Sequence, residues 1–155
     1  MDPFFYLPLA GVVFFIISRI FFYSQKNKII EKYKQPDAVV FKNIHGTIVS
    51  VTKGSLSYSK SFQWCSFEIF MNQNSMFLFP KDFYIVSGKC INLRFGSDRR
   101  NTRNPEVLRE FHIHDNYVEL ILYPDWMPNT KRTISLEGLN KQEILLFRKA
   151  LLKEA

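Results

Sequence analysis

The sequence of 155 residues lacks the short motifs that mark the common enzyme classes. It contains no glycine-rich nucleotide loop of the GxGxxG or GxxxxGK[ST] type, no GxSxG nucleophile turn, no HExxH metal pair and no CxxC pair. It also lacks an internal repeat, so one compact domain with an appendage is the largest organisation that we expect. We therefore expect a protein that is not an enzyme and that holds no cofactor.

Cysteine is scarce, with Cys65 and Cys90 as the only two. Two cysteines supply no disulfide framework, which suits a reducing compartment. The pair admits two interpretations, a redox pair or two buried free thiols, and buried cysteine usually behaves as a small apolar residue. No Asn-x-Ser/Thr sequon occurs, as expected for a domain that never meets the glycosylation machinery.

The first segment is almost free of charge, because residues 3–23 (PFFYLPLAGVVFFIISRIFFY) contain only Arg19. A helix of this length rises about 31 Å at ~1.5 Å per residue, which matches a hydrocarbon core of roughly 30 Å. Aromatic residues stand at both ends, as is typical of membrane interfaces, and Arg19 is close enough to one end to reach the headgroups. We predict that residues 1–24 form a transmembrane anchor with its span over 3–23.

Three other interpretations of this segment compete. A cleaved signal peptide needs a basic start and a small-residue cleavage site, whereas the chain begins Met1-Asp2 and no A-x-A pattern follows the apolar stretch. A helix this uniformly apolar would need protein on every side if it were buried in a soluble core. A helix lying on the membrane surface needs a polar face, which this segment does not have.

Lysines follow the apolar segment, and we predict that residues 25–36 form a basic juxtamembrane linker. Its four lysines against Glu31 give a net charge of +3, and they are Lys26, Lys28, Lys32 and Lys34. The positive-inside bias then predicts a single-pass protein of the cell membrane, with the N-terminus outside and residues 25–155 cytoplasmic. The lysines are either solvated residues of a stop-transfer anchor or contacts for anionic lipid headgroups, worth ~1 kcal/mol each.

The linker also has an apolar side. Ile29, Ile30 and Tyr33 would share one face of a helix, so we expect the helix of the span to continue into the linker until Pro36 stops it.

From residue 37 onward, short β-rich runs alternate with turn signals. We predict seven or eight strands, enough to close a small barrel or sandwich. The runs 39–42 and 44–52 together form the first strand, and further runs cover 55–60, 62–71, 75–79, 89–95, 109–114, 117–123 and 133–137. In the run 62–71, Cys65, Phe67 and Ile69 should point one way and the residues between them the other. Asn104 and Pro105 predict a short helix over 105–109.

The chain ends in a predicted helix over 141–153 with a well-specified start. Asn140 can cap this helix, with Glu143 as the capping-box partner, while Leu139 can contact Ile144 as a hydrophobic staple. The expected apolar face consists of Ile144, Leu145, Phe147, Leu151 and Leu152.

The mainly β pattern that ends in RTISLEGLNKQEILLFRKALL, a strand running into an amphipathic helix, resembles the pleckstrin-homology-like (PH-like) superfold. A membrane anchor ahead of such a domain resembles the small bacterial membrane proteins with a PH-like cytoplasmic domain. The resemblance implies that residues 37–155 form a soluble domain, a small antiparallel β-barrel or sandwich closed by the C-terminal helix. Where eukaryotic PH domains typically carry a Trp in that helix, this chain has Phe147. The first hairpin offers only Lys53 and Lys60, so phosphoinositide binding is not implied.

Two clusters remain as candidate sites. His112 and His114 lie on one face of a predicted strand and are either two solvent-facing residues or a metal pair, and we assign no metal site. The loop around Arg99, Arg100 and Arg103 is either solvated or a contact surface for a headgroup, an acidic protein or a nucleic acid. Beyond the linker, 16 basic and 12 acidic residues leave a charge of only +4, so we expect no nucleic-acid partner.

These observations predict a membrane-anchored binding or adaptor protein. Its cytoplasmic β domain would engage a protein partner or anionic lipid headgroups, through the linker lysines and the arginine loop. Two alternatives stay open, a structural subunit of a membrane complex that uses the span as its interface, and a metal-dependent enzyme around His112 and His114.

Overall fold

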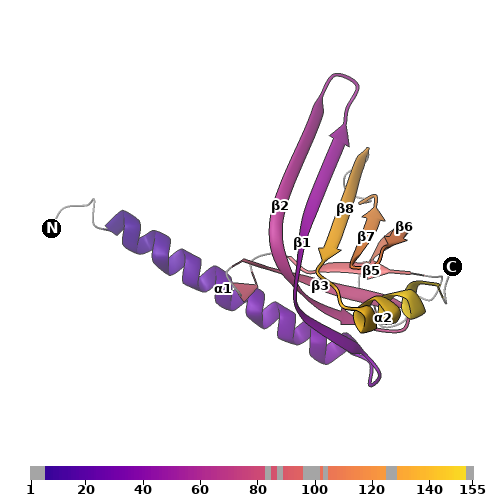
Figure 1. Ribbon diagram of the computed structural model, residues 1–155. Coiled ribbons are helices and arrows are strands. Elements are labelled where there is room, and N and C mark those ends of the chain that lie inside the picture. The colour runs from indigo at the N-terminus through magenta and orange to yellow at the C-terminus, as the bar shows by residue number, and fades with distance from the viewer. Residues whose placement is uncertain are drawn as a thin grey trace.

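The computed structural model describes residues 6–82, 85–86, 89–95, 102, 105–124 and 129–152. Figure 1 shows a long helix that leads into a curved sheet, with a short second helix near the C-terminus. The elements are α1 (Tyr6–Tyr33), β1 (Val39–Lys53), β2 (Tyr58–Met71), β3 (Ser75–Asp82), β4 (Ile85–Val86), β5 (Ile91–Arg94), β6 (Glu106–Ile113), β7 (Tyr117–Leu122), β8 (Thr130–Glu137) and α2 (Lys141–Leu152).

Seven of the strands close into a barrel. Their hydrogen-bonded order is β2-β1-β8-β7-β6-β5-β3, and β2 also pairs with β3, which completes the ring, while β4 pairs with β3 at its edge. The mainly β class and the barrel are therefore confirmed. The expectation of purely antiparallel pairing is wrong at one place, because β5 and β6 pair in parallel through Leu93 with Glu106 and Arg94 with Val107. Parallel neighbours cannot be joined by a tight hairpin, and residues 95–105 separate these two strands in the sequence.

The barrel interior is apolar and follows the predicted alternation. Phe67 and Ile69 of β2 are fully buried in the main core, while Phe70 lies on the other side of the strand in a separate cluster. The runs predicted over 55–60 and 62–71 form the single strand β2, which pairs with β1 from Lys53 opposite Tyr58 to Val39 opposite Met71.

Helix α2 packs against the barrel core, where the rings of Phe147 and Phe41 stack at a centroid distance of 4.9 Å. The capping box is confirmed, because the Glu143 backbone N–H donates to Asn140 Oδ1 at 2.9 Å and the Asn140 N–H donates to Glu143 Oε2 at 2.8 Å. The predicted apolar face was too wide. Leu145 and Leu152 are exposed, because the stripe that meets the barrel consists of the buried Ile144, Phe147 and Leu151 with the partly buried Leu146 and Ala150.

The short helix predicted over 105–109 is wrong, because Glu106–Ile113 is strand β6. Pairing with β7 along most of its length, and with β5 at its start, satisfies the backbone of this segment and outweighs the local capping pattern. The proposed cap residue, Asn104, lies outside the described residues. Glu106 faces Arg132 of β8, with 3.6 Å between Oε1 and Nη1.

Helix α1 continues through the linker as one helix and ends at Tyr33, three residues before Pro36, as predicted. Within the described part of the chain it is the one helix long and apolar enough to cross a membrane, by length and composition, and an 18-residue window within Pro8–Tyr33 has a mean hydropathy of 1.4. Its N-terminal half extends away from the barrel (Figure 1), and Phe14 in this half is 75% exposed.

Strands β1 and β8 approach each other closely at Gly46. A Cβ atom at this position would overlap the backbone oxygen of Ser135 and lie 3.0 Å from the ring of Phe67. Three residues earlier in β1, Asn43 adopts a left-handed backbone (φ 56°) where the pairing with β2 shifts register. The bend at Asn43 and the contact at Gly46 together set the curvature of β1.

We predict that Gly46→Ala lowers the free energy of unfolding by about 2–3 kcal/mol, because the new methyl group has backbone rather than a flexible side chain as its neighbour. Denaturant unfolding of the full chain in detergent, followed by circular dichroism, measures this change. The matched control is Gly11→Ala in α1, where no atom lies within 4 Å of the added Cβ. Equal stability of the two variants would contradict the close approach.

Candidate functional site: a groove between the helix and the barrel

The C-terminal part of α1 packs on the outside of the barrel. Its Ile29, Ile30 and Tyr33 contact a cluster formed by Phe70, Phe77 and Phe79 of β2 and β3. The rings of Tyr33 and Phe77 stack at a centroid distance of 5.8 Å. The shared apolar face predicted for the linker is therefore confirmed, and the surface that it covers is the outer face of the sheet.

Asn72, in the turn between β2 and β3, fixes the end of α1. Its Nδ2 donates to the carbonyl oxygen of Tyr33 at 2.9 Å, and its Oδ1 accepts from the Gln35 N–H at 3.1 Å. The last carbonyls of a helix have no partner within the helix, so a side chain that supplies one stabilises the helix end. Asn72 is only 3% exposed, which makes this connection between helix and barrel a buried one.

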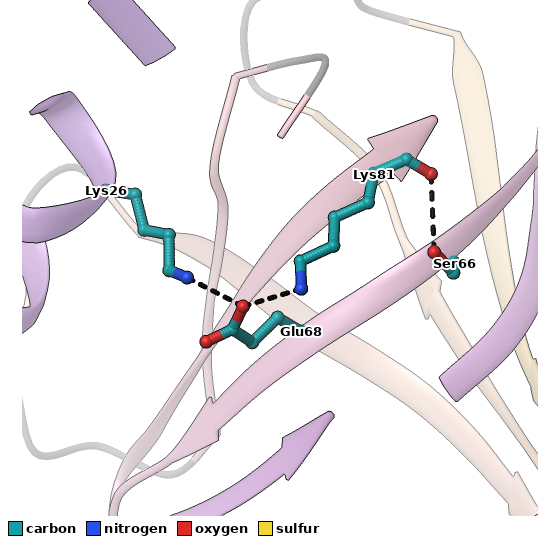
Figure 2. A network of polar contacts seen from close by, with 4 residues as sticks. All are labelled: Lys26, Ser66, Glu68 and Lys81. Atoms are coloured by element: carbon teal, nitrogen blue, oxygen red, sulfur yellow. Dashed lines mark hydrogen bonds and ion pairs between the residues drawn. The ribbon is translucent and has the colours of Figure 1, made fainter. Parts of the chain in front are cut away.

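Glu68 of β2 joins α1 to the barrel through two ion pairs. Figure 2 shows its carboxylate between Lys26 of α1 and Lys81 of β3, with Oε2 at 2.6 Å and 2.7 Å from the two Nζ atoms. Burial alone would raise the pKa of the Glu68 carboxyl, but the hydrogen bonds and charges of the two lysines outweigh burial and lower this pKa below its ordinary value. The carboxylate is therefore ionised at neutral pH, and the three side chains carry a net charge of +1.

A groove of about 750 Å³ opens between α1 and the barrel next to this contact. Its apolar surface comes from both sides, from Phe21, Phe22 and Ile29 of α1 and from Phe77 and Phe79 of β3. Its polar lining residues are Gln25, Lys26, Lys28, Lys32, Tyr33, Lys89, Asn92 and Glu106, and Cys90 completes the lining.

The charges at the groove are mostly positive. Lys28, Lys32 and Lys89 are exposed, whereas the carboxylate of Glu106 has Arg132 as its neighbour. Burial raises the pKa of the Cys90 thiol to about 12, although the charge of Lys89 acts in the opposite direction. A thiol with this pKa stays protonated at neutral pH and is a poor nucleophile. The lining therefore suits binding of a partly apolar, anionic molecule better than covalent chemistry.

The structure distributes the predicted site residues unevenly. Of the linker lysines, Lys26 is largely buried in the ion pair with Glu68, Lys28 and Lys32 line the groove, and Lys34 is exposed just after α1. The arginines of the predicted contact loop, Arg99, Arg100 and Arg103, lie outside the described residues.

Sequence reasoning missed the barrel side of the groove, above all Phe77, Phe79 and Lys89, and it missed the neighbouring ion-pair residue Glu68. One pattern pointed to it. Phe77 and Phe79 alternate with the core residues Met76 and Leu78, so both faces of β3 are apolar. A strand with two apolar faces is covered on both sides, which indicates that another element packs on its outer face.

Of the other candidate residues, Cys90 lines the groove, whereas His112, His114 and Cys65 do not. His112 and His114 are exposed, in agreement with the solvent-facing interpretation of the pair, and the ring of His114 stacks on that of Tyr117 with 4.0 Å between their centroids. No group of three potential metal ligands comes together within the described ranges. Cys65 and Cys90 form no disulfide with each other, and Cys65 packs against the main core while Cys90 packs against the cluster beneath α1.

The chain matches no protein-family model, and no curated protein matches it in sequence. Its function must therefore be inferred from the groove and its surroundings.

We predict that Glu68→Gln lowers the free energy of unfolding by about 3 kcal/mol at neutral pH, because it leaves two nearly buried lysines facing each other without the carboxylate. Unfolding of the full chain in detergent measures the change. The matched control is Glu110→Gln, which removes the same charge from an exposed position on β6 and should change stability by less than about 0.5 kcal/mol.

The stabilisation by Glu68 should also depend on pH. Because folding lowers the pKa of this carboxyl from 4.5, its contribution is fully present above pH 4.5 and is lost as the pH falls through the lower pKa of the folded state. The stability difference between the wild type and Glu68→Gln should therefore shrink on acidification below pH 4.5. A difference that stays constant down to strongly acidic pH would show that the ion pairs do not hold the helix.

Proposed function

We propose that this chain is a single-pass, membrane-anchored binding protein. In this proposal residues 3–23 span the cell membrane, the N-terminus lies outside, and residues 25–155 are cytoplasmic. The length and hydropathy of α1 support the span, and the lysines that follow it support the orientation. The closed barrel followed by α2 supports a relation to the PH-like domains, which the sequence resembles.

The ligand that fits the groove best is an anionic lipid of the same bilayer. The observation that carries this proposal is the position of the lining residues along α1. Phe21 and Phe22 belong to the predicted span over 3–23, whereas Lys28 and Lys32 lie one to three turns beyond its end. The groove therefore crosses the level at which acyl chains meet headgroups, with aromatic surface on one side of this level and lysines on the other.

A lipid would enter the groove from the side without leaving the bilayer. Its acyl chain would lie against Phe21, Phe22 and Phe79, and its phosphate would meet the ammonium groups of Lys28, Lys32 and Lys89. Each of these lysines is exposed and so retains the conformational freedom to follow a headgroup. A protein partner remains compatible with the adaptor hypothesis, but the groove offers no feature that favours a peptide over a lipid.

We predict that the triple variant Lys28→Glu, Lys32→Glu, Lys89→Glu retains at least ~10-fold less anionic lipid than the wild type. The reason is that three attractions of ~1 kcal/mol each become repulsions. Native mass spectrometry of the full chain, released from nanodiscs of phosphatidylcholine and phosphatidylglycerol, measures the retained lipid. The matched control carries the same change of charge at Lys42, Lys141 and Lys149, which are exposed and outside the groove lining. Equal lipid retention by both variants would contradict the groove as the binding site.

The proposed orientation predicts that a green fluorescent protein fused after Ala155 fluoresces, because this reporter folds in the cytoplasm. Alkaline phosphatase fused at the same position should stay inactive, since it needs an oxidising compartment to form its disulfides. In a chain with Lys26, Lys28, Lys32 and Lys34 changed to Gln, the difference between the two reporters should become smaller, because the positive charges that set the orientation are gone. An active phosphatase fusion of the wild-type chain would contradict the proposed orientation and place the C-terminus outside.

A further inference from the structure

The hairpin formed by β1 and β2 exposes large aromatic side chains on one face. Trp64 is 76% exposed, Tyr58 is 66% exposed and Phe62 is 55% exposed. The rings of Phe62 and Trp64 contact each other edge to face, with 5.7 Å between their centroids. Exposed aromatic residues that gather on one face indicate an interaction surface.

The pairing of the two strands extends this surface. Phe62 lies opposite Val49, and Lys60 lies opposite Val51. Residues that face each other across an antiparallel pair point to the same side of the sheet. We name the surface formed by Val49, Val51, Tyr58, Phe62 and Trp64 the aromatic face. The other side of the hairpin is used by the barrel, since Ile48 and Cys65 pack against the main core.

The charge of the hairpin has one sign. From Ala38 to Phe67 the sequence contains no acidic residue, and its basic residues are Lys42, Lys53 and Lys60. Lys60 lies on the same side of β2 as Phe62 and Trp64. This combination of Trp, Tyr and Phe with lysine matches an anionic membrane interface, where amphipathic rings sit at headgroup level and ammonium groups meet phosphates.

The aromatic face belongs to the same side of β2 that holds α1. Glu68 and Phe70, which contact α1, alternate with the core residues in the same phase as Phe62 and Trp64. Lys26, the partner of Glu68, lies three residues beyond the predicted span, which is ~4.5 Å along the helix. Trp64 lies four residues before Glu68, which is ~13 Å along strand β2. In Figure 1 the hairpin and the N-terminal half of α1 both extend away from α2.

We infer that the aromatic face lies against the interface of the bilayer that α1 crosses, an inference that rests on the membrane span proposed above. The barrel then has two contacts with the membrane, one through helix α1 and a second through the β1–β2 hairpin. The hairpin contact would fix the tilt of the barrel relative to the membrane plane and so hold the mouth of the groove at the level of the lipid headgroups.

Trp64 provides the test, because the variant Trp126→Phe leaves it as the only Trp in the chain. We expect its emission in the full chain to fall about two-fold when vesicles of phosphatidylcholine and phosphatidylglycerol carry bromine on their acyl chains, since Trp at an interface lies within reach of the upper chain segments. If Trp126→Phe does not fold, the difference in quenching between the wild type and Trp64→Phe supplies the same quantity.

The control places the probe elsewhere on the barrel. In Trp64→Phe, Trp126→Phe, His112→Trp the single Trp is at an exposed position of β6, which lies three strands from β2 in the ring. Its emission should not change with brominated lipid and should be quenched by iodide in the buffer. Trp64 should show the opposite behaviour toward both quenchers.

Two outcomes overturn the inference while the span stands. If the membrane fraction keeps the chain after alkaline carbonate extraction but iodide quenches Trp64 and brominated lipid does not, the aromatic face points to solvent. If neither agent quenches Trp64, protein covers this face, either a second copy of the chain or another partner. Release of the chain by carbonate would instead contradict the proposed span, and the inferred contact of the hairpin with the membrane would then be contradicted as well.

Discussion

The buried carboxylate of Glu68 is the constraint on which the arrangement of this protein depends. A carboxylate with 8% of its side chain exposed requires compensation, and its two partners come from different elements, Lys26 from the helix and Lys81 from β3. The helix therefore has one position along the barrel at which all three charges are satisfied. An apolar contact alone would tolerate sliding, whereas this ionic contact defines the register between helix and sheet.

The apolar and capping contacts extend the same connection. Phe70, Phe77 and Phe79 give the outer face of the sheet an apolar surface that only a covering element removes from water, and Ile29, Ile30 and Tyr33 supply that cover. Asn72 then holds the last turn of the helix. Just beyond this contact, the helix and the barrel enclose the groove between them. The groove thus exists because the helix is held firmly at one end and is free of the sheet at the other.

The features that the sequence predicted correctly are those decided within a few residues. The capping box of Asn140 and Glu143 and the alternation along β2 depend on local spacing, and both are present. The parallel pairing of β5 with β6 and the docking of α1 depend on partners that are distant in the sequence, such as Lys26 and Glu68, 42 residues apart. The local pattern at Pro105 predicted a helix because it contained no information about the strands on either side. The groove was predictable only in part, through the lysines of the linker and the apolar face between them.

The unbroken path of α1 from Tyr6 to Tyr33 has a consequence for how the barrel would be presented at the proposed membrane. An α-helix turns by ~100° for each residue, so the number of residues between the span and Lys26 sets the azimuth of the barrel around the helix axis as well as its height. A flexible tether would let the barrel rotate freely and present every flank in turn. With α1 crossing the membrane as proposed, each copy of the chain would present the same flank to the lipid, and neighbouring copies would differ only by rotation about the membrane normal.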